Sequence, residues 1–172
     1  MKILYIISKY ITFPGAFLRC FWEQFVCKIQ KVAIENNKCL QVNEMCGHIE
    51  HETIDGKVKS FLNALIPGLL VFIAGAVLLT APFVNLLLIG ILQKPLKVIM
   101  YVMLYLALSM LTNIFPSTED AIFMWENYKQ LGKGLKILFA PGAAIMYVGS
   151  YLEKYCVTFF VNIIIAALII FL

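Results

Sequence analysis

The chain has little charge for its size. Charged residues make up 14% of its 172 residues, whereas 62% are hydrophobic and the mean hydropathy is +0.87. Soluble domains contain about 25% charged and about 45–50% apolar residues. A soluble domain of this size could not bury so much apolar surface, so the composition predicts an all-α integral membrane protein in contact with the lipid bilayer.

Several functional signatures are also absent. The sequence has no Gly-rich phosphate loop, no Ser-His-Asp set and no concentrated basic patch, which argues against nucleotide and nucleic-acid binding. The net charge of +4 is better explained by attraction to anionic lipid headgroups. The cysteines lack CxxC spacing, so we expect neither a disulfide framework nor a zinc ribbon, and most of them should be buried apolar side chains: Cys20, Cys27, Cys39, Cys46 and Cys156.

Residues 1–60 differ in composition from residues 61–172. The first region contains eight of the fourteen cations, both histidines and six of the ten acids. On a helical wheel, residues 16–31 predict an amphipathic helix that lies on or partly in the membrane. Its apolar side is Leu18, Phe21, Trp22, Phe25, Val26 and Ile29, and its polar side is Arg19, Cys20, Glu23, Gln24, Cys27, Gln30 and Lys31.

The second region predicts four membrane spans, at about 61–80, 98–115, 137–152 and 155–172. Pro82 and Asn85 indicate a break after the first span, followed by a short interfacial piece over 82–93. Glu153 and Lys154 interrupt the last apolar region, and we expect them in a tight outer turn between two spans. At mid-membrane they would instead mark a functional site.

The distribution of cations predicts the topology. Residues 1–60 and 116–136 together contain eleven of the fourteen cations. Cytoplasmic loops are rich in Lys and Arg, so with four crossings both termini should be cytoplasmic. The unpatterned cysteines suit a bacterial cytoplasmic membrane.

The stretch F-P-G-A-F-L-R-C-F-W-E begins at Phe13. It resembles the F-P-G-x-x-x-H-E-x-x-H opening of integral-membrane zinc metallopeptidases of the site-2 protease type. In that alignment the first His position is Arg19, the Glu position is Cys20 and the second His position is Glu23. Asn113 to Asp120 is similar to the N-x-x-P-x-x-x-x-D element that supplies a carboxylate ligand in those enzymes, one residue shorter between Pro116 and Asp120. The resemblance implies the scaffold of such an enzyme without its HExxH site.

Arg19 is four residues from Glu23, so on a helix the two side chains should form a structural ion pair. A permanent cation at a ligand position also repels a metal dication. We therefore expect no catalytic residues and no cofactor.

The segment from Cys46 to Glu52 contains both histidines. If zinc is bound, the candidate ligands are His48 and His51, with Glu23 and Asp120 as distant contributors. A solvated polar turn is the simpler interpretation of this segment. Ser117 and Asp120 likewise have a simpler role as the N-cap and N3 residues of a helix that follows Pro116.

Two classes of function remain open. The first is a non-catalytic, metallopeptidase-like scaffold that binds a partner protein or a membrane-embedded peptide. The second is a small transporter or pore-type subunit that forms homo-oligomers, suggested by Asn63, Asn85, Asn162, Glu153 and Lys154. An active peptidase with a site rearranged around residues 48–52 is a third alternative.

Overall fold

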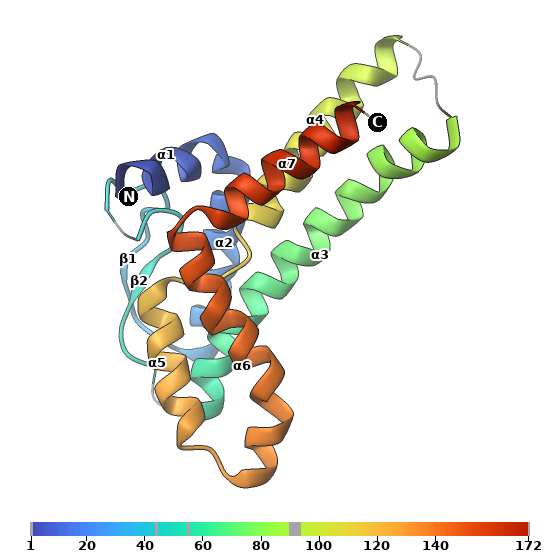
Figure 1. Ribbon diagram of the computed structural model, residues 1–172. Helices are drawn as coiled ribbons and strands as arrows, with labels where there is room; N and C mark the ends of the chain where they lie inside the picture. Colours follow the sequence, from blue (N-terminus) through green and yellow to red (C-terminus); the bar gives the residue numbers. More distant parts are fainter. Residues whose placement is uncertain (1, 44, 55, 90–93, 172) are drawn as a thin grey trace.

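The computed structural model describes residues 2–43, 45–54, 56–89 and 94–171. These residues form seven helices and one small antiparallel sheet, so the fold is mainly helical, as predicted (Figure 1). The elements are α1 (Lys2–Ile11), α2 (Phe13–Gln30), β1 (Ile34–Asn36), β2 (Glu50–His51), α3 (Lys57–Ile89), α4 (Lys94–Thr112), α5 (Thr118–Lys129), α6 (Lys133–Lys154) and α7 (Val157–Phe171).

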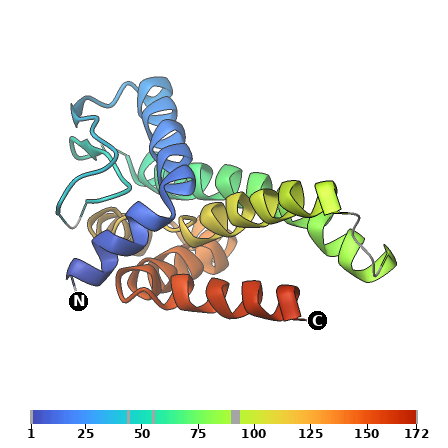
Figure 2. The ribbon, with the colours of Figure 1, turned by 90° about the horizontal axis from the view of Figure 1, so that it is seen from above.

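The helices α3 and α4 pack against each other, and α2 packs against both of them (Figures 1 and 2). Gly15 allows this close approach, because a Cβ atom at this position would collide with the carbonyl group of Ser109 on α4. The backbone N–H of Gly15 also donates a hydrogen bond to Oγ of Ser109 at 2.8 Å. Residues 1–30 are therefore attached directly to the helices of the second region.

The break predicted near Pro82 is not present. α3 continues through Pro82 and Asn85 to Ile89, and residues 90–93 of the predicted interfacial piece lie outside the described residues. Proline in a long apolar helix removes one backbone hydrogen bond, and such helices tolerate the loss when neighbouring groups compensate. The prediction gave the proline too much weight relative to the apolar run around it.

Two helical stretches among the described residues are long and apolar enough to cross a membrane, Lys57–Thr80 and Lys133–Lys154. Two shorter stretches are also apolar, Val98–Thr112 and Val157–Leu168. All four overlap the predicted spans, and the first two satisfy the length criterion by themselves.

The amphipathic helix forms as α2, but with its polar side turned inward. Arg19 and Glu23 are buried against the rest of the protein, with relative exposures of 0% and 4%. The exposed row on the outer side is apolar and repeats every four residues: Phe13, Phe17, Phe21, Phe25 and Ile29. The prediction was a helix that lies on or partly in the membrane, whereas Arg19 and Glu23 are fully buried against protein and the apolar row faces the surroundings.

The predicted outer turn at Glu153 is wrong. Glu153 is 4% exposed and ends α6 beside the N-terminal helices. Figure 1 shows α7 leaving the end of α6 at a wide angle, with α6 beside α5 and α7 along α4, so the two helices do not fold back as a hairpin. The turn between them contains Cys156, which adopts a left-handed backbone conformation at φ 61°.

Candidate functional site

The inward side of α2 carries the Arg19–Glu23 pair at the four-residue spacing from which it was expected. Nε of Arg19 donates to Oε1 of Glu23 at 2.7 Å. The guanidinium also donates through Nη1 to the carbonyl of Ile114 and through Nη2 to that of Ala64 at 3.4 Å. Arg19 therefore joins α2 to α3 and to the segment after α4.

Space for this guanidinium comes from Gly68 on α3. A Cβ atom at Gly68 would lie 2.6 Å from Nη1 of Arg19 and would collide with the carbonyl oxygen of Ile114. The absence of a side chain on α3 thus allows the arginine to reach its carbonyl partners. Gly68 therefore supplies the room that the long Arg19 side chain needs.

His48 shares Oε1 of Glu23 with Arg19. Its Nδ1 atom lies 2.8 Å from Oε1 of Glu23, and the backbone N–H of Ile49 donates to Oε2 at 3.2 Å. Burial alone would raise the pKa of Glu23, but the charges and hydrogen bonds of His48 and Arg19 outweigh it and lower that pKa to about 2. Glu23 is therefore an anion held by two cationic partners.

A second carboxylate completes this group of charges. Nζ of Lys9 forms an ion pair with Oε1 of Glu153 and donates to Oδ1 of Asn113 at 2.7 Å. Oε1 of Glu153 also lies 3.7 Å from Nε2 of His48, and its Oε2 accepts from the backbone N–H of Phe115. We call Lys9, Arg19, Glu23, His48 and Glu153 the buried network, since each is at most 4% exposed.

His48 lies between the two acids of the buried network. Burial by itself lowers the pKa of His48, but Glu23 and Glu153 reverse this effect and raise the pKa above its ordinary value of 6.5. A protonated His48 donates to one carboxylate and faces the other. The arrangement can hold α1, α2, α6 and the 46–49 segment together electrostatically, because each buried charge has an opposite charge in contact.

The shifted pKa values of Glu23 and His48 predict that the free energy of unfolding falls at both low and high pH. Glu23 has a lowered pKa, so its contribution is present above its ordinary value of 4.5 and is lost as the pH falls toward 2. His48 has a raised pKa, so its contribution is present below 6.5 and is lost as the pH rises through the folded-state pKa. We expect His48→Gln to remove the alkaline loss and to keep the acid loss. Chemical unfolding at several pH values checks this, and an unchanged alkaline limb in the variant would contradict it.

The remaining two candidate ligands form a separate pair. Nδ1 of His51 donates to the carbonyl of Glu52 at 2.8 Å, which leaves Nε2 facing Nδ2 of Asn63 at 3.2 Å and Oδ1 of Asp120 at 3.4 Å. His51 is positioned by β2, which pairs with β1 in the antiparallel register Ile34 to His51. Burial raises the pKa of Asp120 more than the adjacent His51 lowers it.

Ser117 caps α5 as predicted. Its Oγ accepts from the backbone N–H of Asp120 at 3.1 Å, and its hydroxyl donates to Oδ2 of Asp120 at 2.7 Å. Asp120 therefore has a structural role at the start of α5 as well as its contact with His51. An open cavity of about 480 Å³ adjoins this pair, and its polar lining comprises Glu35, Asn43, Glu50, His51, Glu119 and Asp120.

The structure thus brings the four candidate metal ligands together as two pairs, Glu23 with His48 and Asp120 with His51. In the part of the chain that the structure describes, no three His, Cys, Asp or Glu side chains are arranged to hold a metal ion. The cations of Arg19 and Lys9 are buried beside the Glu23–His48 pair. Zinc binding by these residues is an alternative to the expected absence of a cofactor, and the geometry offers a metal ion two of the four ligands at a time.

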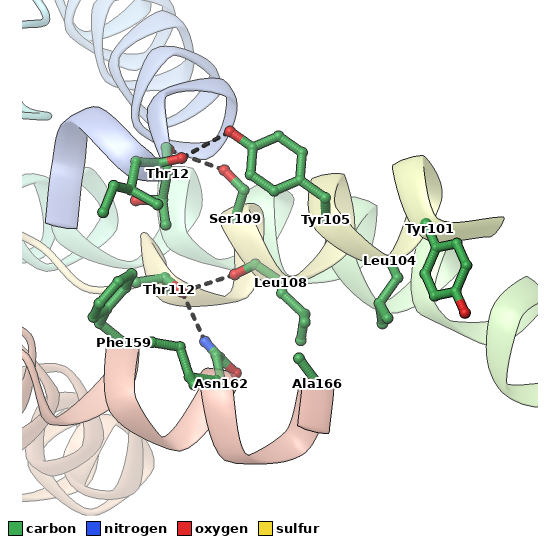
Figure 3. A pocket seen from close by; sticks show the side chains of 12 residues that line it. Thr12, Tyr101, Leu104, Tyr105, Leu108, Ser109, Thr112, Phe159, Asn162 and Ala166 are labelled. Atoms are coloured by element: carbon green, nitrogen blue, oxygen red, sulfur yellow. Dashed lines mark hydrogen bonds between the residues drawn. The ribbon is translucent and has the colours of Figure 1, made fainter. Parts of the chain in front are cut away.

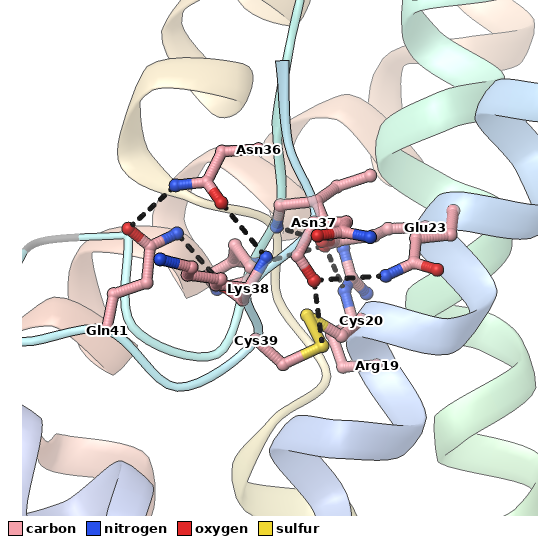
Figure 4. Close-up of a disulfide and its surroundings, with 11 residues drawn as sticks. Arg19, Cys20, Glu23, Asn36, Asn37, Lys38, Cys39 and Gln41 are labelled. Carbon is pink, nitrogen blue, oxygen red and sulfur yellow. Dashed lines mark hydrogen bonds and ion pairs between the residues drawn. A yellow bond between two sulfur atoms is a disulfide. The ribbon is translucent and has the colours of Figure 1, made fainter. Parts of the chain in front are cut away.

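A disulfide joins Cys20 on α2 to Cys39, which corrects the expectation of unpaired cysteines. Figure 4 shows Cys20 beside Arg19 on the helix, with Cys39 reaching it from the polar segment after β1. Cys27 is buried nearby, where burial raises the pKa of its thiol to about 12. Sequence spacing alone could not pair these cysteines, because the pairing depends on how residues 37–41 return to α2.

This disulfide is expected to stabilise the oxidised protein by about 3 kcal/mol, since it closes a loop with a sequence separation of 19. The free energy of unfolding, measured with and without a reductant, checks the value. Cys39→Ser provides the control, because its stability should not respond to the reductant. Equal stability of the oxidised and reduced wild-type protein would contradict the prediction.

Lys9 is a part of the site that sequence reasoning missed. Lys9 interrupts an apolar run near the N-terminus, and Glu153 interrupts another near the C-terminus. Isolated charges of opposite sign in apolar segments need partners, and this signal could have paired them. No family model, curated protein or solved structure matches the chain.

Proposed function

We propose that this chain is a multi-pass membrane protein without hydrolytic activity that keeps the arrangement of a site-2-type metallopeptidase and binds a partner protein or a membrane-embedded peptide. One observation carries the proposal. Arg19 stands at the first ligand position of the resembled motif, fully buried and bonded to Glu23, while Cys20 stands at the position of the general base and forms a disulfide. Hydrolysis by zinc needs three protein ligands, an open coordination position and a base.

The partner surface in this proposal is the apolar row of α2, namely Phe13, Phe17, Phe21, Phe25 and Ile29, because these side chains are 47–65% exposed. The buried network holds α2 rigidly behind this row. A photoreactive residue at position 21 in native membranes tests the surface. A single crosslinked protein or peptide in stoichiometric amount supports it, whereas lipid adducts alone contradict it.

Restoring the motif tests the loss of activity. The wild-type protein should cleave no membrane peptide, with or without added zinc. The variant that combines Arg19→His, Cys20→Glu and Glu23→His, with Cys39→Ser to avoid a free partner thiol, rebuilds the HExxH spacing on α2. Zinc binding by this variant and its absence in the wild type support a lost metal site. Peptide cleavage by the wild type would contradict the proposal.

The location is part of the same proposal: a bacterial cytoplasmic membrane with both termini in the cytoplasm, as the cation count indicates. The C-terminus is the more informative end to test, because the proposed topology requires α6 and α7 to cross separately and the two helices do not fold back as a hairpin. Fluorescence of a C-terminal green fluorescent protein fusion supports this topology. Activity of an alkaline phosphatase fusion at the same position contradicts it.

A transporter or pore-type subunit is the second candidate. It is favoured by the burial of Glu153 between Lys9 and His48, since buried ionisable groups in membrane proteins often lie on ion or proton pathways. Proton or ion flux in proteoliposomes, abolished by Glu153→Gln, would select this function. Absence of flux from the wild-type protein would leave the binding function as the one supported.

A further inference from the structure

A cavity of about 430 Å³ lies between α4 and α7. Figure 3 shows Thr12 at one end of the cavity, where α1 meets α2, and Tyr101 at the other end. Leu104, Leu108 and Ala166 form its apolar walls. Between Tyr101 and Thr112 the groove follows α4 for about 16 Å, at ~1.5 Å per residue.

The end near Thr12 carries polar side chains, but their hydroxyl donors are already used within the protein. The hydroxyl of Ser109 donates to the carbonyl of Thr12 at 2.9 Å, and that of Tyr105 donates to the carbonyl of Ile11 at 2.7 Å. The hydroxyl of Thr112 donates to the carbonyl of Leu108 at 2.8 Å. A ligand at this end therefore finds no free hydroxyl hydrogen on these three side chains.

The carboxamide oxygen Oδ1 of Asn162 is a hydrogen-bond acceptor that these contacts leave unused. Because the hydroxyl hydrogen of Thr112 is given to Leu108, Thr112 can only accept from Asn162, which donates through Nδ2 at 2.9 Å. This contact, drawn in Figure 3, fixes the orientation of the carboxamide, and the hydrogen bonds found among the described residues include none to Oδ1. Asn162 lines the cavity and keeps 9% of its surface exposed, so a hydrogen-bond donor in the groove can reach this acceptor.

The open side of the groove belongs to an apolar surface. Tyr101, Tyr105 and Ile163 line the cavity and are 42–53% exposed, and Val102 and Ile164 continue the surface on either side. The cavity has the volume of a small-molecule site, about 300–1,000 Å³. A helix segment of the same length and about 10 Å across would need roughly three times the volume of this cavity, whereas a single alkyl chain needs less.

We propose that this groove binds one alkyl chain of a membrane lipid that carries a hydrogen-bond donor, a hydroxyl or an amide N–H, opposite Oδ1 of Asn162. The donor group of the lipid lies at the C-terminal end of α4, near the polar residues 116–136. The alkyl chain of the lipid extends from there along α4 toward Tyr101. This orientation places the polar part of the lipid near the polar part of the protein. The site goes beyond the proposed partner binding and uses a different face of the molecule.

The experiment uses the full chain in nanodiscs that contain hexadecanol with a photoreactive diazirine at the chain terminus. The O-methyl ether of the same molecule serves as the matched probe, since it lacks the donor. We expect the alcohol to crosslink to α4 and α7 about three- to tenfold more than the ether, the range set by a hydrogen bond between groups in a membrane. Asn162→Ala should reduce this preference to nearly one while crosslinking by the ether stays the same.

A pair of substitutions controls for the shape of the groove. Ala166 lines the cavity and Ala167 does not, so Ala166→Trp should abolish crosslinking by both probes and Ala167→Trp should leave it unchanged. Equal crosslinking of the wild-type protein by alcohol and ether would overturn the proposal. Crosslinking to an associated protein in place of the probes would also overturn it, because another chain would then occupy the groove.

Discussion

Replacing Arg19 with Met is expected to destabilise the protein by about 3–5 kcal/mol, the cost of removing one partner from a buried ion pair. The substitution keeps much of the side-chain volume but removes the guanidinium that contacts Glu23 at 2.7 Å. The carbonyls of Ile114 and Ala64 lose their donor at the same time. The free energy of unfolding in detergent, measured by denaturant titration, checks this value.

Lys28→Met is the matched control for that experiment, since Lys28 is an exposed cation on the same helix. Its effect should stay within about 0.5 kcal/mol. If the two variants had equally small effects, Arg19 would not hold the buried network together. A combined Arg19→Met and Glu23→Gln variant should recover part of the loss, because it leaves no unpaired carboxylate behind.

The second large effect is expected at the other end of the buried network. Lys9→Met should cost about 3–5 kcal/mol, because Glu153 would keep only His48 as a charged partner. The double variant Lys9→Met and Glu153→Met should be more stable than the sum of the single effects predicts, with a coupling energy of about 1–3 kcal/mol. Denaturant unfolding of the four proteins in this cycle provides the measurement.

The exposed Lys133 at the start of α6 serves as the control, and Lys133→Met should have little effect. Additive effects of the Lys9 and Glu153 substitutions would mean that the two residues act independently. That result would contradict a network that joins α1 to α6. It would also remove the reason for treating Glu153 as part of the site.

The amphipathic pattern predicted the position of α2 but not its orientation. The same spacing of apolar and polar residues fits a helix that turns its charges to water and one that turns them to protein partners. The choice depends on whether partners exist, and here they come from distant segments: His48 and the carbonyls of Ala64 and Ile114. No local pattern encodes such contacts, so the spacing of residues could not show that this face is fully buried against protein.

Local chemistry was predicted more successfully than long-range pairing. The cap of α5 by Ser117 follows from residues three positions apart, and the Arg19–Glu23 pair follows from one helical turn. The contact between Lys9 and Glu153 joins residues 144 positions apart, and Cys20 meets Cys39 only because the chain turns after β1. Such pairings depend on the packing of whole helices, which the spacing of residues does not specify.

The disulfide bears on the proposed topology. Cys39 lies in the segment that the cation count assigns to the cytoplasm, where thiols are normally kept reduced. Rapid alkylation of Cys20 and Cys39 in intact cells, followed by mass spectrometry, determines the state of the pair. Alkylated thiols agree with a cytoplasmic segment, whereas a persistent disulfide would place residues 31–54 on the oxidising side of the membrane.

The central claim is that a guanidinium and a disulfide sulfur occupy the positions at which the resembled enzymes bind zinc and activate water. Elemental analysis of the purified full-length chain, after equilibration with zinc and removal of the excess, tests it most directly. The account predicts far less than one zinc per chain, with no change on His48→Gln or His51→Gln. One zinc per chain, lost with either substitution, would contradict it.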